Sequence, residues 1–103
     1  MPSVTVRIPD SLRLNGYIPD PINTHAKARL MAILTREDLA LGEAPLREVS
    51  VHANFWLNAA DAARLTEMGQ ARQVPMSIGE VITTLLVEDA KREQKAAADR
   101  KPP

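Results

Sequence analysis

Val49-Ser50-Val51-His52-Ala53-Asn54-Phe55-Trp56-Leu57 is the stretch that decides the fold. Every second residue from Val49 onward is apolar, and the residues between them are polar or, at Trp56, an indole. A period of two is typical of a β-strand with one buried and one outward face. We therefore expect a strand here, with His52, Asn54 and Trp56 sharing the outward face.

Two helices are expected after this strand. Asn58-Ala59-Ala60-Asp61 and Ser77-Ile78-Gly79-Glu80 both have the pattern of a capping box, which marks the start of a helix. The first helix is predicted to end near Gln73. The second carries an uninterrupted apolar stripe at helical spacing, formed by Ile78, Val81, Ile82, Leu85 and Leu86. The last ten or so residues are charged and rich in Ala, and we expect a flexible tail there.

The first half of the chain has a weaker pattern of the same kind. Residues 4–9 alternate as a short strand that Pro9-Asp10 ends, and residues 12–21 are expected to form a loop. Asp20-Pro21 is typical of a helix start. The helix that follows either ends near Thr35, with a second short helix after it, or runs to Leu41 before Gly42. This half is either a degenerate second copy or an added arm.

Composition limits the class of protein. The chain has 103 residues, 13 basic and 13 acidic side chains, a formal net charge of zero and no cysteine. This length suits one small domain, and a disulfide scaffold or thiolate zinc site is excluded. The sequence contains no catalytic triad context, glycine-rich phosphate loop or His pair at ligand spacing, so we expect no enzyme, no cofactor and no metal. With no apolar leader and no membrane-length apolar run, a cytoplasmic protein is expected.

One strand followed by two helices cannot close a hydrophobic core. A lone strand has two unpaired edges, and its apolar face needs more cover than two helices supply. The simplest solution is a two-fold homodimer in which the strands of two chains pair antiparallel.

The strand with Leu65 eight positions after Leu57, together with Ser77-x-x-Glu80-Val81-Ile82, resembles the ribbon-helix-helix (Arc/MetJ-type) family. The resemblance covers residues 48–92. It implies a mainly α fold with a short strand: an intertwined homodimer with an antiparallel two-stranded ribbon and an N-terminal strand-and-helix extension. The implied division is an extension at 1–46, a DNA-binding and dimerisation domain at 47–92 and a tail at 93–103.

In that family the ribbon's outward side chains enter the DNA major groove. The resemblance thus implies that His52, Asn54 and Trp56, with Ser50 at the edge, contact bases. It also implies that the backbone N–H groups of Ser77, Ile78 and Gly79 face a phosphate, with glycine allowing close approach. We further hypothesise phosphate contacts from basic residues of the first half, namely Arg7, Arg13, Lys27 and Arg29.

The resemblance implies a sequence-specific DNA-binding protein, either a transcriptional repressor or a plasmid maintenance or transfer accessory factor. Its partners would be double-stranded DNA and a second copy of the chain, with higher assembly on DNA left open. One alternative is an antitoxin whose N-terminal half binds a protein partner. Another is a dimeric protein-interaction module without DNA binding, which the zero net charge favours.

Overall fold

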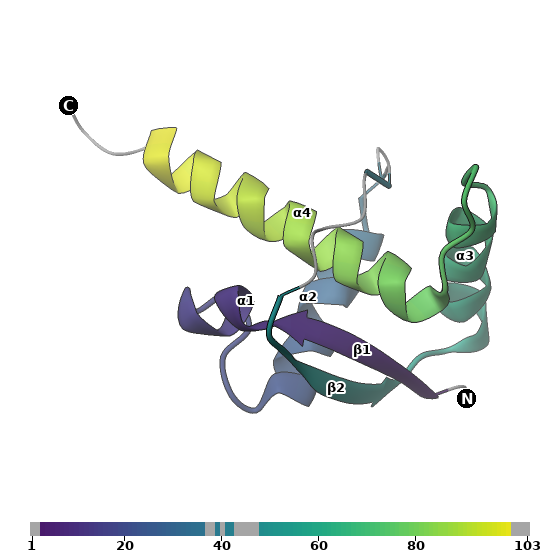
Figure 1. Cartoon of the computed structure of the whole chain (residues 1–103), viewed down its shortest axis with the longest axis horizontal. Coiled ribbons are helices and arrows are strands. Elements are labelled where there is room, and N and C mark those ends of the chain that lie inside the picture. The colour runs from purple at the N-terminus through teal and green to yellow at the C-terminus, as the bar shows by residue number, and fades with distance from the viewer. Residues whose placement is uncertain (1–2, 37–38, 40, 43–47, 100–103) are drawn as a thin grey trace.

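The structure is a computed structural model, and it describes residues 3–36, 39, 41–42 and 48–99. These residues form a two-stranded antiparallel sheet and four helices, a mixed α/β arrangement (Figure 1). The order strand, helix, helix occurs twice along the chain. In sequence, the elements are β1 (Ser3–Pro9), α1 (Asp10–Leu14), α2 (Ile22–Leu34), β2 (Ser50–Trp56), α3 (Ala59–Gln70) and α4 (Ile78–Asp99).

The two strands pair with each other inside one chain. Their antiparallel register runs from Ser3 opposite Trp56 to Pro9 opposite Ser50. Alternation decides which face is buried: β1 turns Val4, Val6 and Ile8 inward, and β2 turns Ala53 and Phe55 inward. The strand partner that we expected from a second chain is thus supplied by β1.

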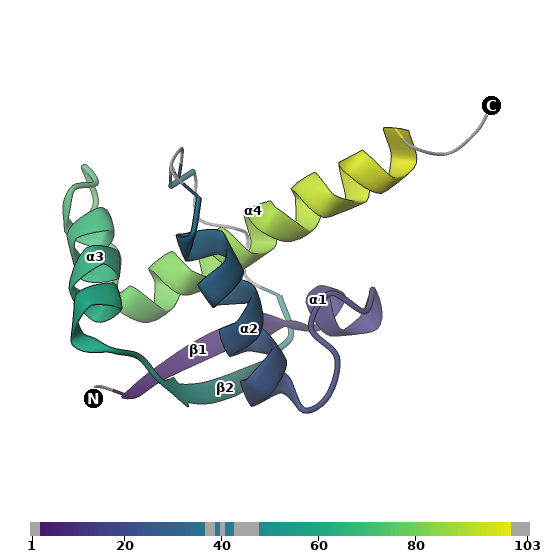
Figure 2. The ribbon, with the colours of Figure 1, turned by 180° about the vertical axis from the view of Figure 1, so that it is seen from behind.

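The second helix of each half packs on the strand of the other half. In Figures 1 and 2, α4 runs beside β1 and α2 passes steeply across β2, and the two helices also contact each other. α3 stands against the first part of α4. One hydrophobic core results, to which both halves contribute. Its largest fully buried apolar side chains are Ile8, Ile18, Leu30, Ile33, Leu57, Leu65, Ile82, Leu86, Val6 and Val81.

The connection between β1 and α2 differs from the expected loop. Residues 10–14 form the short helix α1, in which Leu12 is buried. The helix ends at Asn15-Gly16, where Gly16 has a φ of 81°, a conformation that glycine adopts without strain. Asp20 was expected to cap α2, but no side-chain hydrogen bond caps this helix, and the residue before Ile22 is Pro21.

The second half follows the predicted starts more closely. Asn58 Oδ1 accepts from the N–H of Asp61 at 2.8 Å, and Ser77 Oγ accepts from the N–H of Glu80 at 3.3 Å. Asp61 does not reach back to the Asn58 backbone. Its carboxylate accepts from Asn58 Nδ2 instead, at 3.0 Å. α4 continues to Asp99, so residues 93–99 of the expected tail are helical, and this end of the helix projects from the body (Figure 1).

α2 ends at Leu34, as the shorter of the two alternatives for this helix predicted. The Thr35 hydroxyl donates to the Ala32 carbonyl at 2.6 Å. The expected short helix through Leu41 falls largely outside the described residues. Within the described part of the chain, none of the helices has the length and apolar character that crossing a membrane requires.

Candidate functional site

The face of the sheet turned away from the helices carries the candidate site. In the register of β1 and β2, each outward residue of one strand lies opposite an outward residue of the other. Thr5 lies opposite Asn54, and Arg7 lies opposite His52. Trp56 closes one end of this face and is 58% exposed. We call these five residues, Thr5, Arg7, His52, Asn54 and Trp56, the ribbon face.

Hydrogen bonds order the centre of the ribbon face. The Thr5 hydroxyl donates to Asn54 Oδ1 at 2.6 Å, which fixes the carboxamide. Among the described residues, no acceptor is seen for the Asn54 amide nitrogen, which therefore remains a donor to solvent or a ligand. Arg7 takes no part in the ion pairs of the described residues. The ribbon face thus offers a carboxamide, a guanidinium and an imidazole side by side.

The first turn of α4 borders the ribbon face on the β1 side. A hollow of about 260 Å³ lies between Thr5, Arg7 and His52 on the ribbon and Ser77, Gly79, Glu80 and Thr83 on α4. Thr83 joins the two walls, because its hydroxyl donates to the Arg7 carbonyl at 2.8 Å. The expected phosphate-binding turn is therefore next to the ribbon, but an acidic residue, Glu80, also lines the hollow.

The fold requires a glycine at position 79, for a reason that was not evident from the sequence. A Cβ at this position would lie 2.8 Å from the Thr5 carbonyl oxygen, so the glycine lets α4 approach β1 closely. The close approach expected toward a phosphate is made here toward the strand. Ile78, beside it, is half-buried and packs against the hydrophobic core.

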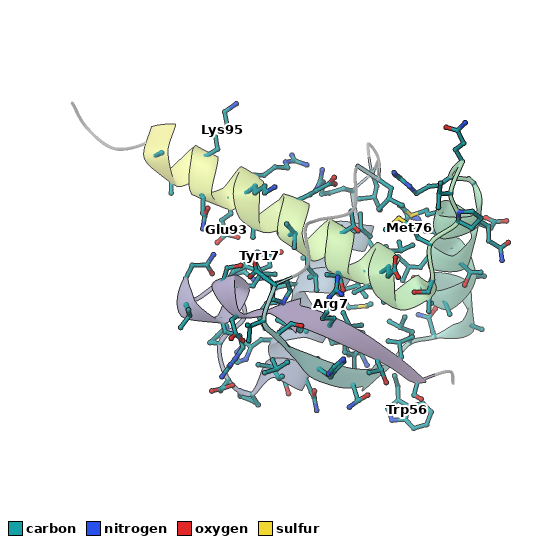
Figure 3. The ribbon with its side chains drawn as sticks, in the orientation of Figure 1. Arg7, Tyr17, Trp56, Met76, Glu93 and Lys95 are labelled. Carbon is teal, nitrogen blue, oxygen red and sulfur yellow. The ribbon has the colours of Figure 1, made fainter. Side chains whose placement is uncertain are left out.

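A second hollow lies at the Trp56 end. It has a volume of about 210 Å³ and is lined by Lys27 and Met31 of α2, by Trp56 and Leu57, and by Asn58 and Asp61 at the start of α3. In Figure 3 the Trp56 ring points away from the body of the molecule. Ser50, expected at the edge of the site, is half-buried opposite Pro9, at the other end of the ribbon.

Arg13 and Arg29, for which phosphate contacts were hypothesised, are both paired with carboxylates of the chain. Arg13 is shared between Asp10 at 3.5 Å and Asp20 at 3.9 Å. Arg29 pairs with Glu93 at 2.8 Å, donates from Nε to the Tyr17 carbonyl at 2.9 Å, and lies 4.2 Å from the Tyr17 ring centroid. A phosphate contact by either guanidinium group stays a hypothesis.

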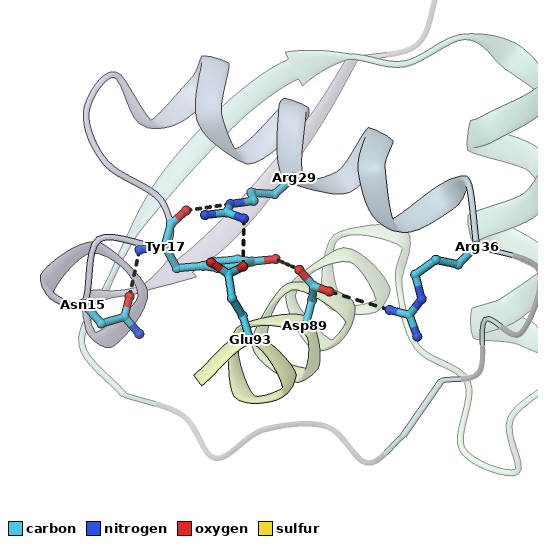
Figure 4. A network of polar contacts seen from close by, with 6 residues as sticks. All are labelled: Asn15, Tyr17, Arg29, Arg36, Asp89 and Glu93. Carbon is cyan, nitrogen blue, oxygen red and sulfur yellow. Dashed lines mark hydrogen bonds and ion pairs between the residues drawn. The ribbon is translucent and has the colours of Figure 1, made fainter. Parts of the chain in front are cut away.

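Arg29 belongs to a polar network that ties α4 to the first half (Figure 4). The Tyr17 hydroxyl donates to Asp89, whose other carboxylate oxygen lies 3.6 Å from Arg36. Burial of the phenol, and then its hydrogen bond to Asp89, raise the pKa of Tyr17 far above its ordinary value. The neutral phenol thereby links the segment after α1 to α4.

The sequence analysis named four of the five residues of the ribbon face, His52, Asn54 and Trp56 as base contacts and Arg7 as a phosphate contact. The alternation of residues 4–9 also places Thr5 outward beside Arg7, but Thr5 was not named as a site residue. The register with β2, which brings Thr5 to Asn54, has no signal in either strand alone.

The described residues contain no group of three or more His, Cys, Asp or Glu side chains placed to hold a metal ion. A scan of protein-family models and searches of curated proteins and of solved structures found no match to this chain.

Proposed function

We propose that this protein is a sequence-specific DNA-binding protein of the ribbon-helix-helix type that reads the major groove with its ribbon face. Its role would be that of a transcriptional repressor or a plasmid maintenance or transfer accessory factor. One observation carries the proposal: a two-stranded ribbon backed by helices gathers Thr5, Arg7, His52, Asn54 and Trp56 on its free side. The major groove of B-DNA admits a two-stranded ribbon.

The chemistry of these side chains suits base edges. Arg7 can donate two hydrogen bonds to O6 and N7 of guanine, and a carboxamide such as Asn54 can bind N6 and N7 of adenine. His52 can donate or accept. Trp56 offers a flat apolar surface to a thymine methyl group or a sugar, and its ring nitrogen is a donor.

The start of α4 would hold the neighbouring phosphate. The unpaired N–H groups of a helix N-terminus and the helix dipole favour an anion there, and Ser77 and Gly79 border the ribbon at this point. Glu80 opposes an anion, which limits the non-specific part of the affinity. The zero net charge acts in the same direction. We therefore expect base contacts to supply most of the preference for the target site over other DNA.

The proposal is tested by incubating the purified full chain with a pool of random DNA duplexes at two salt concentrations and sequencing the retained DNA. An enriched motif at both salts supports the proposal. Retention without enrichment that is lost at the higher salt indicates backbone contacts alone. Absence of retention at low salt overturns the proposal. Trp56 is the only tryptophan of the chain and lies on the ribbon face, so its fluorescence should change on binding.

Asn54→Ala is the sharpest variant. We expect it to weaken binding to the selected site by about 1–3 kcal/mol for each hydrogen-bonded base that it no longer reaches, and to relax specificity at that position. Gln70→Ala removes an exposed carboxamide from α3 and should bind as the original chain does. Equal affinity of Asn54→Ala and the original chain for the selected site would contradict the ribbon assignment.

A second candidate function is protein binding through the Trp56 end of the ribbon face. It is favoured by the exposed Trp56, by the hollow between that ring, Lys27 and Met31, and by the zero net charge. A chain that retains no DNA but is held by an immobilised protein partner, and no longer binds that partner after Trp56→Ala, would establish this function instead.

A further inference from the structure

The two strands of the ribbon carry different side chains, although their backbones are arranged symmetrically. The register places the Val6–Ala53 pair at the centre of the seven paired positions. A two-fold axis through this pair would exchange Thr5 with His52 and Arg7 with Asn54. These residues differ in chemistry: a hydroxyl corresponds to an imidazole, and a guanidinium corresponds to a carboxamide.

The helix contacts at the two outer edges of the ribbon, on the β1 side and on the β2 side, also differ. On the β1 side, Gly79 brings the first turn of α4 against the Thr5 carbonyl. On the β2 side, Asn23 in the first turn of α2 uses its side-chain oxygen to accept from the Asn54 N–H at 2.9 Å. The hollow at the Trp56 end includes a lysine, Lys27, whereas no lysine lines the hollow at the β1 side.

One backbone group at each outer edge of the ribbon is already paired and is therefore closed to a strand of a second chain. At the outer edge of β1 the Arg7 carbonyl accepts from Thr83 Oγ1 at 2.8 Å, and at the outer edge of β2 the Asn54 N–H is bound by Asn23. Backbone groups that are already paired do not recruit another strand. The helices of both halves already cover the inward face.

We infer that one chain is a complete reading unit and that its DNA target is an asymmetric duplex site. This inference rests on the proposed DNA binding. A ribbon built from two identical chains presents the same side chains twice and selects palindromic half-sites. Here the two symmetry-related positions hold Arg7 and Asn54, so one half of the contacted site favours guanine and the other favours adenine.

The test has two readouts on the full chain: the motif selected from the random duplex pool, and the number of chains bound to one minimal copy of it, measured by sedimentation of the complex. We expect a non-palindromic motif and one chain per copy. A palindromic motif bound by two chains overturns this inference but leaves the proposed function standing. Retention without an enriched motif also overturns it. Absence of retention overturns the proposed function itself.

Exchange of two side chains sharpens the result. Arg7→Asn makes the two symmetry-related positions alike and should lower the preference for the guanine by roughly 5- to 150-fold. Asn54→Arg makes them alike in the opposite sense and should lower the preference for the adenine at the other position. Arg92→Asn removes the same charge from an exposed site on α4 beside α2 and should keep the original motif. An unchanged motif for both ribbon variants, with the fold verified by circular dichroism, would refute the inference.

Discussion

Tyr17 is a single residue that connects three segments of the molecule. It is 5% exposed, its hydroxyl donates to Asp89 on α4, and its carbonyl accepts from Arg29 on α2. Removing one partner of a buried hydrogen bond to a charged group leaves that group unsatisfied, which costs more than the bond itself contributes.

Tyr17→Phe should therefore lower the free energy of unfolding by about 1–3 kcal/mol, because Asp89 is left without this donor. Urea denaturation followed by circular dichroism measures the change. Asp89→Asn alone should also destabilise, and the double variant should be destabilised by less than the sum of the two single variants, since they break the same hydrogen bond. Strictly additive effects would argue against a direct interaction.

The raised pKa of Tyr17 also predicts how stability depends on pH. The unfolded phenol ionises near its ordinary pKa of 10.0, whereas burial and Asp89 keep the folded phenol neutral well above that value. This contribution is thus fully present below pH 10 and declines as the pH rises further, at up to about 1.4 kcal/mol per pH unit.

Urea denaturation of the original chain and of Tyr17→Phe between neutral pH and strongly alkaline pH checks this. The stability difference between them should shrink above pH 10. Tyr17 is the only tyrosine, so near-UV absorbance reports its ionisation directly. Parallel stability profiles for the two proteins would be the contrary result.

At the scale of elements, the packing of α4 on β1 depends on a hydroxyl. Thr83 and Thr84 are both buried, but Thr83 donates to the Arg7 carbonyl and to its own helix, whereas Thr84 bonds only to the Glu80 carbonyl one turn earlier. A hydroxyl that bonds back to its own helix satisfies itself without joining two elements.

Thr83→Val should lower the free energy of unfolding by about 1–3 kcal/mol, because the Arg7 carbonyl is left without its donor. Thr84→Val is the matched control and should be close to neutral. Amide hydrogen exchange should also become faster in β1 for the first variant alone. Equal effects of the two substitutions would show that the helix-to-strand bond does not matter.

Gly69, near the end of α3, lies against the turn that leads into α4, and this close contact leaves no room for a side chain. Gly→Ala in a helix normally stabilises by up to about 1 kcal/mol, but a Cβ here would lie 2.4 Å from the Met76 carbonyl oxygen and 2.8 Å from Val81 Cγ2. We expect Gly69→Ala to destabilise by about 1–3 kcal/mol instead. Thermal unfolding measures the sign, with Gln70→Ala, an exposed neighbour, as the control. A gain in stability would contradict this packing.

Sequence patterns predicted the strand and helices of the second half, but they did not predict which other parts of the chain these elements pair with. The alternation around Asn54 and the cap at Ser77 are local, so a short window of sequence contains them. The pairing of β1 with β2 and the bond from Tyr17 to Asp89 join residues far apart in the chain; the latter two are 72 positions apart. No periodicity encodes such long-range pairs, which is why the ribbon partner and the polar network were missed.

At the scale of the whole molecule, residues 3–20 complete the core. β1 buries Val4, Val6 and Ile8, and it provides the only strand that pairs with β2 among the described residues. Burying side chains of this size contributes about 1.5–3 kcal/mol each, which is a large share of the stability of a small domain.

Deletion of residues 1–20 should therefore abolish cooperative unfolding by urea. Addition of a peptide with the sequence of residues 1–20 should restore helical circular dichroism, because β2 and α4 recover their partner. A truncated chain that unfolds cooperatively by itself would contradict this dependence, and its mass in solution would then show whether a second chain has taken the place of β1.

The bond from Thr83 to the Arg7 carbonyl spans 76 positions, and this separation also determines when the ribbon can form during synthesis. During synthesis β1 leaves the ribosome first, yet its partner strand follows only at residues 50–56 and the helix that covers its edge later still. Pairings so distant in sequence form slowly, and they form only after both ends exist. A nascent chain that has not yet released residue 83 therefore has no complete ribbon, and under the proposed function it could not yet bind DNA.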